Sequence, residues 1–259
     1  MEKRILMNLR HLLVAFSVVW LAGCATSPSN SVDGPLKPIT QARPLSSHVT
    51  SLESNNDLWE RIRKGFAIPD LQHELVDVQE QWYGSRPDYI DRMTTRSSKY
   101  LYHIVEELEQ RNMPTELALL PYIESAFNPQ AVSSAKAAGM WQFMPATGSY
   151  FELTQNAFRD DRRDVLASTK AALDYLEKLH RMFGDWHLAL AAYNWGEGSV
   201  GRAIKRNERQ SMGTSYTDLT MPNETRNYVP KLQAVKNIIA NPEKFKIELP
   251  NIENHPYFQ

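Results

Sequence analysis

Glu124 is the residue of this sequence best placed to do chemistry, because it lies in a largely apolar stretch from Ala118 to Pro129. Read as a helix, the stretch puts Leu117, Leu120 and Glu124 on one face, at spacings of three and four residues. A carboxyl group on an apolar face is poorly solvated, so we expect its pKa to be raised. Such a group still holds its proton near neutral pH, as a general acid must. An isolated glutamate is more often a surface residue, so the assignment depends on what surrounds it.

Prolines set the expected limits of this helix. Pro114 suits its first turn. Pro121 cannot donate a hydrogen bond to the carbonyl of Leu117, so we expect a kink just before Glu124. Asn128-Pro129 is expected to end the helix, because the residue before a proline avoids the helical conformation.

Further blocks of glycine, aromatic and polar residues follow Glu124 along the chain. After Asn128-Pro129 and Ser133 they are Gly139-Met-Trp-Gln-Phe-Met-Pro-Ala-Thr147, Ala192-Tyr-Asn-Trp-Gly-Glu-Gly198 and Glu224-Thr-Arg-Asn-Tyr-Val-Pro230. In this order and spacing they resemble the family 1 lytic transglycosylases, which have a goose-lysozyme-like catalytic domain, the SLT domain. The resemblance implies an all-α, lysozyme-like (goose-type) catalytic domain with an N-terminal helical extension. It also implies a lyase that acts on peptidoglycan glycan strands.

The resemblance assigns a role to each matching residue. Glu124 becomes the single catalytic acid and base. The substrate-binding positions are Ser125, Ser133, Gln142, Met144, Tyr193, Asn194 and Tyr228. In the implied reaction Glu124 protonates the oxygen between N-acetylmuramic acid and N-acetylglucosamine, and the 2-acetamido group stabilises the anomeric carbon. The ionised glutamate then takes the proton of the 6-hydroxyl, which attacks to give a 1,6-anhydro sugar without water.

Three positions depart from the family pattern. Met140 stands where leucine is commoner, Lys136 where glycine is frequent, and Trp195 where a small residue is usual. The indole of Trp195 could narrow the cleft or add a stacking surface.

A second carboxylate is the usual partner of a glycosidase acid, and none with a comparable setting is found in the sequence. Glu116, Glu152 and Asp164 lie among polar or charged residues and are expected to be solvated. Two alternatives to the lyase stay open. A lysozyme-type hydrolase needs an ordered water and a base that the sequence does not reveal. A non-catalytic glycan-binding envelope protein would have little reason to keep Glu124.

Helical patterns dominate from Asp57 onward, and no long alternating run predicts a strand. The expected helices, besides that of Glu124, cover 57–78, 97–111, 168–183, 186–193 and 228–239. Gly184 is placed to end one of them, and Pro230 lies in the first turns of another. Trp141 is expected to be mostly core, and Arg162-Arg163-Asp164 a structural ion-pair cluster.

The first residues indicate export. Basic residues precede an apolar run, and Leu21-Ala22-Gly23-Cys24 resembles a bacterial lipobox, in which Cys24 is lipidated. The expected organisation is a lipoprotein signal peptide (1–23), a flexible tether (24–56), an N-terminal helical extension (57–111), the catalytic domain (112–245) and a C-terminal tail (246–259). The lipid anchor and Ala25 predict a lipoprotein of the outer membrane that faces the periplasm.

Charge and side-chain spacing exclude other classes of function. The formal net charge of −1 is close to neutral, so nothing in the composition suggests a surface that binds nucleic acid. Gly196-Glu-Gly-Ser-Val-Gly201 fits a dinucleotide fingerprint, but an alanine-rich helix precedes it instead of a strand. His73-Glu74, His180 and His187 lack the further ligands of a zinc site. We therefore expect no cofactor and no metal. We also expect a monomer.

Overall fold

The computed structural model describes residues 57–257, so the expectations about Cys24, the signal peptide and the tether lie outside the described residues. The described chain is helical and contains isolated β-bridges in place of strands, which confirms the all-α class. Its α-helices are α1 (Leu58–Lys64), α2 (Glu74–Gly84), α3 (Pro87–Ser97), α4 (Leu101–Gln110), α5 (Leu120–Ser125), α6 (Pro145–Tyr150), α7 (Val165–Phe183), α8 (Trp186–Trp195), α9 (Glu197–Arg209), α10 (Asn223–Arg226) and α11 (Tyr228–Ala240). Short 3-10 helices cover η1 (Thr115–Leu119), η2 (Asp161–Arg163), η3 (Tyr216–Asp218) and η4 (Pro242–Phe245).

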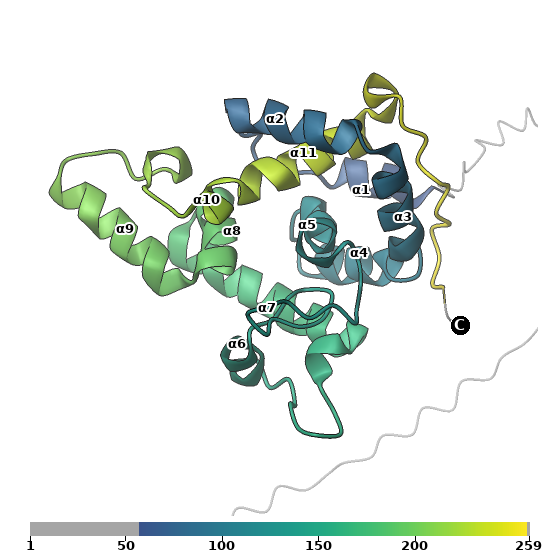
Figure 1. Cartoon of the computed structure of the whole chain (residues 1–259), viewed down its shortest axis with the longest axis horizontal. Coiled ribbons are helices and arrows are strands. Elements are labelled where there is room, and N and C mark those ends of the chain that lie inside the picture. Colours follow the sequence, from purple (N-terminus) through teal and green to yellow (C-terminus); the bar gives the residue numbers. More distant parts are fainter. Residues whose placement is uncertain (1–56, 258–259) are drawn as a thin grey trace, which may run out of the picture. The chain divides into compact units, whose positions relative to one another are not determined.

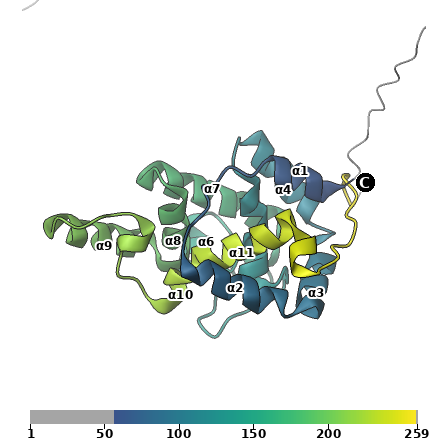
Figure 2. The same cartoon turned by 90° about the horizontal axis from the view of Figure 1, so that it is seen from above.

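Two helix pairs build most of the core around α5. Helix α8 packs on α7, and its alanine-rich turns let the two helices approach closely, because Ala189, Ala191 and Ala192 are fully buried. Helix α11 packs along α2, and the two run side by side in both views (Figures 1 and 2). Helix α11 also contacts α5, so the short helix that carries Glu124 is braced from the C-terminal part of the chain.

The expected helix over residues 57–78 is wrong, because α1 ends at Lys64 and α2 begins only at Glu74. Gly65 caps α1, and Pro69 lies in the loop that follows. The loop is held by the Glu116 carboxylate, which accepts hydrogen bonds from the backbone N–H groups of Ala67 (2.8 Å) and Ile68 (2.8 Å). A long-range contact therefore satisfies backbone groups that a continuous helix would have paired internally.

The C-terminal segment after η4 is part of the same core. Ile247 and Ile252 are buried, and the indole of Trp59 donates to the carbonyl of Pro250 (2.9 Å). The backbone N–H of Leu58 donates to Ile252 (2.9 Å), and an antiparallel bridge pairs residues 57 and 253. The segments 57–111, 112–245 and 246–257 thus contribute side chains to one hydrophobic cluster.

The other helix predictions differ from the structure mainly at their ends. Helix α7 begins three residues before Ser168 and ends where expected, at Gly184 with φ +67°. Helix α11 contains Pro230 in its first turn, and α8 continues to Trp195. The helix expected from Ser97 starts at Leu101, because Ser97 ends α3. Helices α3 and α9 are polar and were not predicted.

Candidate active site

Glu124 lies at the end of α5, in a short helix that a proline starts and a left-handed turn stops. Pro121 occupies the first turn of α5, so the expected kink is the beginning of the helix itself. The helix ends at Ser125, earlier than the predicted Asn128-Pro129, because Ala126 (φ +51°) and Phe127 (φ +54°) adopt left-handed conformations. Each such residue costs about 1–2 kcal/mol. The fully buried ring of Phe127, 4.5 Å from that of Tyr122 between centroids, offsets this cost.

The Glu124 carboxyl is half-buried and accepts a hydrogen bond from the hydroxyl of Tyr228. Burial is the largest influence and raises the pKa of Glu124 from 4.5 to about 7. The Tyr228 hydrogen bond lowers this pKa, the charge of Glu224 raises it, and the charge of Lys231 lowers it. The expected rise in pKa and its cause are confirmed.

Tyr193 from α8 and Tyr228 from α11 converge on this carboxyl. Burial, and next the charge of Glu124, hold the pKa of the Tyr193 hydroxyl well above its usual value. Burial and the charge of Glu124 also raise the pKa of the Tyr228 hydroxyl, and Tyr193 raises it further. The hydroxyl of Tyr193 donates to the carbonyl of Trp141 (2.9 Å). Helices α5, α8 and α11 therefore bring one acid and two neutral phenols together.

The segment before α6 packs against this group through backbone contacts. Ser125 donates its hydroxyl to the carbonyl of Met140 (2.8 Å), and residues 138 and 143 form an antiparallel bridge. Gly139 has φ +83°, and a Cβ there would lie 1.7 Å from the carbonyl oxygen of Arg162, so only glycine fits. The side chain of Gln142, itself at φ +51°, donates to the carbonyl of Gly139 (2.8 Å).

The side chain of Arg162 holds the segment 136–143 in place. Its guanidinium donates to the carbonyls of Lys136 (2.8 Å) and Phe143 (3.1 Å) and pairs with Asp160 (2.8 Å). The arginines expected at Arg162-Arg163-Asp164 do form a structural ion-pair cluster, but their acid is Asp160, and Asp164 caps α7 instead. The Arg162 contacts fix the turn that faces Ser125.

The remaining predicted substrate-binding residues lie on separate elements. Ser133 accepts a hydrogen bond from the N–H of Ala137 (3.0 Å), and Met144 is 44% exposed just before α6. The side-chain oxygen of Asn194 accepts a hydrogen bond from the hydroxyl of Thr225 (2.8 Å). Within residues 57–257, no hydrogen bond joins any of the three predicted residues to Glu124.

Sequence reasoning misjudged Glu116 and overlooked Glu224. Glu116 was expected to be solvated, but it is 1% exposed and pairs with Lys236 (3.1 Å). Its oxygens are occupied by that ammonium and by backbone N–H groups, which makes it a structural carboxylate. Glu224 is exposed and its charge acts on Glu124. Its position in the block that contains Tyr228 was the available signal.

Glu124 and the two tyrosines lie on an all-α scaffold, and part of this scaffold matches a known protein family. Residues 102–214 match the family model described as the transglycosylase SLT domain. The match starts within α4 and ends before α10, and it includes Glu124 and Tyr193.

Several of the similar relatives are named as membrane-bound lytic murein transglycosylases. The chain is 42% identical to membrane-bound lytic murein transglycosylase D of Escherichia coli over 205 residues, which are 79% of this chain and 45% of that protein. The protein of the same name from a second Escherichia coli strain gives the same values. Membrane-bound lytic murein transglycosylase C of Glaesserella parasuis is 27% identical over 186 residues, 61% of this chain and 50% of that protein. The chain thus spans about half the length of the curated relatives it matches.

Proposed function

We propose that this protein is a peptidoglycan lytic transglycosylase, a lyase that cleaves the β-1,4 bond between N-acetylmuramic acid and N-acetylglucosamine. The observation that carries the proposal is the half-buried carboxyl of Glu124 beside the hydroxyl of Tyr228, where burial raises the pKa of the carboxyl to about 7. Near neutral pH such a group is present both with and without its proton. One residue can therefore donate a proton in the first half of the reaction and accept one in the second.

The reaction proceeds in two steps with Glu124 as the only proton carrier. In the first, the carboxyl protonates the glycosidic oxygen, the bond to the anomeric carbon breaks, and the 2-acetamido oxygen bonds to that carbon. In the second, the carboxylate takes the proton of the 6-hydroxyl, whose oxygen displaces the acetamido group and closes the 1,6-anhydro ring. The proton that leaves Glu124 is replaced, and no water is consumed. Tyr228 stabilises the carboxylate between the steps, because its hydrogen bond favours the ionised form.

Ser125 and Gln142 are assigned a positioning role within the substrate-binding set. The Ser125 hydrogen bond to Met140 holds the turn at 139–142 against the end of α5, and the Gln142 hydrogen bond to Gly139 closes that turn. Ser133, Met144, Tyr193 and Asn194 are proposed to contact the sugar chain, with the exposed Met144 side chain as an apolar wall.

The experiment that tests the proposal is mass spectrometry of the muropeptides released from purified sacculi. Products that end in 1,6-anhydro-N-acetylmuramic acid are expected from the wild type, and none from Glu124→Gln. Glu152→Gln is the matched control, because that glutamate is exposed and should be dispensable. Release by Glu124→Gln at the wild-type rate would contradict the assignment.

A lysozyme-type hydrolase is the second candidate, and Glu224 is the observation that favours it, since a nearby exposed carboxylate could activate water. Glu224→Gln separates the two readings. In the lyase it removes a charge that raises the pKa of Glu124, so activity persists and its alkaline limit moves to lower pH. In the hydrolase it abolishes activity, and the wild-type products carry reducing ends that are heavier by one water.

We further propose that the protein acts in the cell envelope, as a periplasm-facing outer-membrane lipoprotein anchored through Cys24. The relatives named as membrane-bound support an envelope location. Among residues 57–257 no helix is both long and apolar enough to span a membrane. Incorporation of labelled palmitate that Cys24→Ala abolishes would support the anchor; equal labelling of the variant would refute it.

A further inference from the structure

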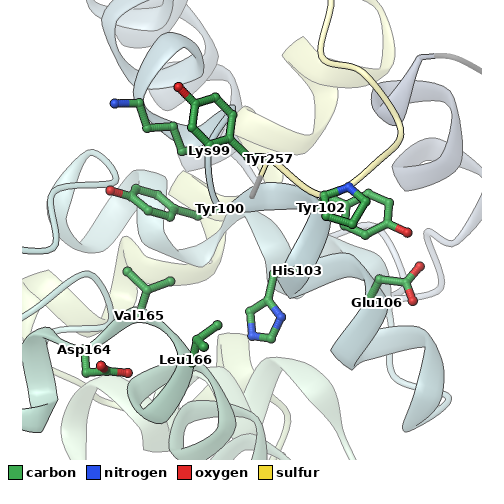
Figure 3. Close-up of a pocket in the computed structure, with 10 residues that line it drawn as sticks. Lys99, Tyr100, Tyr102, His103, Glu106, Asp164, Val165, Leu166 and Tyr257 are labelled. Atoms are coloured by element: carbon green, nitrogen blue, oxygen red, sulfur yellow. The ribbon is translucent and has the colours of Figure 1, made fainter. Parts of the chain in front are cut away.

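A cavity of about 510 Å³ lies on a part of the molecule that the proposed reaction does not use. The start of α4, the first turn of α7 and the C-terminal segment form its walls (Figure 3). None of its lining residues is among those assigned to catalysis or to the sugar chain. The volume falls within the range of small-molecule sites, roughly 300–1,000 Å³.

Aromatic faces and free polar atoms share this cavity. Tyr100, Tyr102 and Tyr257 line it, and Tyr257 is 54% exposed. Figure 3 shows the side chain of His103 projecting from α4 towards Leu166 of α7. Within the described part of the chain, the hydroxyls of Tyr100 and Tyr102 and the ring nitrogens of His103 make no hydrogen bond. These atoms are therefore available to a ligand as donors and acceptors.

The charges of the lining exclude a strongly charged ligand. The carboxylate of Glu106 is paired with Arg61, and that of Asp164 accepts a hydrogen bond from the N–H of Ala167 (2.7 Å) at the start of α7. The ammonium of Lys99 lies 5.8 Å from the centre of the Tyr257 ring. Arg61 offsets the charge of Glu106, and Lys99 offsets that of Asp164, so the lining is close to neutral.

A sugar has the chemistry that this lining recognises. A pyranose ring presents an apolar face of C–H groups that stacks on a tyrosine, and its hydroxyl and acetamido groups pair with neutral polar side chains. We propose that the cavity is a second saccharide site, which binds an N-acetylhexosamine unit of the glycan strand away from Glu124. The choice of ligand rests on the proposed function. A second contact with the same strand raises the effective concentration of the bonds to be cut.

The test is photolabelling of the full chain, purified in detergent, with chitotetraose that carries a diazirine, followed by peptide mapping. Label is expected in two places, around Glu124 and over residues 99–106. In competition with unlabelled chitotetraose, Tyr257→Ala should weaken the second site roughly fivefold to tenfold, the effect of losing one stacked ring, and leave the first unchanged. His103→Ala should act in the same direction. Trp82→Ala is the control, since this exposed aromatic residue on α2 does not line the cavity.

Label confined to the region of Glu124, or label over 99–106 that neither variant weakens, would overturn the inference. Displacement of that label by a free stem tetrapeptide, and not by the sugar, would make the cavity a peptide site and would also overturn it. The outcome is separable from the proposed function. Anhydro products without label at 99–106 refute only the second site, whereas sugar binding there without cleavage of sacculi refutes only the lyase.

Discussion

Replacing Glu124 by glutamine should stabilise the protein at alkaline pH while it removes the proposed activity. Burial, the largest cause, raises the pKa of this carboxyl from 4.5 to about 7 in the folded state. Because the folded-state pKa lies above the unfolded value, the ionised group destabilises the fold. The free energy of unfolding therefore decreases as the pH rises from about 4.5 to about 7 and then stays level. Glutamine keeps the shape of the side chain and removes this titration.

The size of the effect follows from the shift. A difference between 4.5 and about 7 corresponds to about 3 kcal/mol above pH 7. The free energy of unfolding of Glu124→Gln, relative to that of the wild type, should therefore increase by about 2–3 kcal/mol between pH 5 and pH 8. For a domain of this size that is a difference of about 5–10 °C in Tm.

Urea denaturation of both proteins at pH 5 and pH 8 measures this difference directly. Glu152→Gln is the control, because it changes an exposed carboxylate in the same domain and should give the same difference from wild type at both pH values. An advantage of Glu124→Gln that is equal at pH 5 and pH 8 would refute the reasoning, since the raised pKa would then carry no cost in stability.

Three further variants test other contacts. Tyr228→Phe removes the hydrogen bond that lowers the pKa of Glu124, so the alkaline limit of kcat/KM should move to higher pH; an unchanged limit would contradict this. Glu116→Gln leaves the ammonium of Lys236 with only the exposed carboxylate of Asp70 (2.7 Å) as an ionic partner, and urea denaturation should show a loss of about 1–3 kcal/mol. A loss below about 1 kcal/mol would mean that the pair is not structural. Lys136→Gly relieves a left-handed residue (φ +66°) and should raise the free energy of unfolding by about 0.5–1 kcal/mol, whereas a decrease would show that no strain is stored there.

The sequence was informative where one side chain and its near neighbours decide the outcome. The apolar spacing around Glu124 predicted a poorly solvated carboxyl, and burial is the largest cause of its raised pKa. Gly184 and Pro230 stand where the ends of α7 and α11 require them. These signals are local, because the residues that determine them lie within one or two helical turns.

The sequence-based predictions failed where a residue far away in the sequence determines the environment of a side chain. Glu116 looked solvated because its sequence neighbours are polar, but Lys236 and the N–H groups of residues 67 and 68 reach it from elsewhere in the chain. The same contact explains why the helix predicted over residues 57–78 is two helices, α1 and α2, in the structure. The influence of Glu224 on Glu124 is equally non-local. The positions proposed to contact sugar stay predictions, since their roles depend on a ligand.

The antiparallel pairing of residues 57 and 253 has a mechanical consequence. Tension between the N-terminal side of Asp57 and the C-terminal side of Glu253 loads an antiparallel pair so that its bonds separate one after another. The contacts of Leu58 and Trp59 with the C-terminal segment come next in line. We expect a pull between these two points to peel this seam at low force, in small steps, while α5 and its carboxyl stay in register.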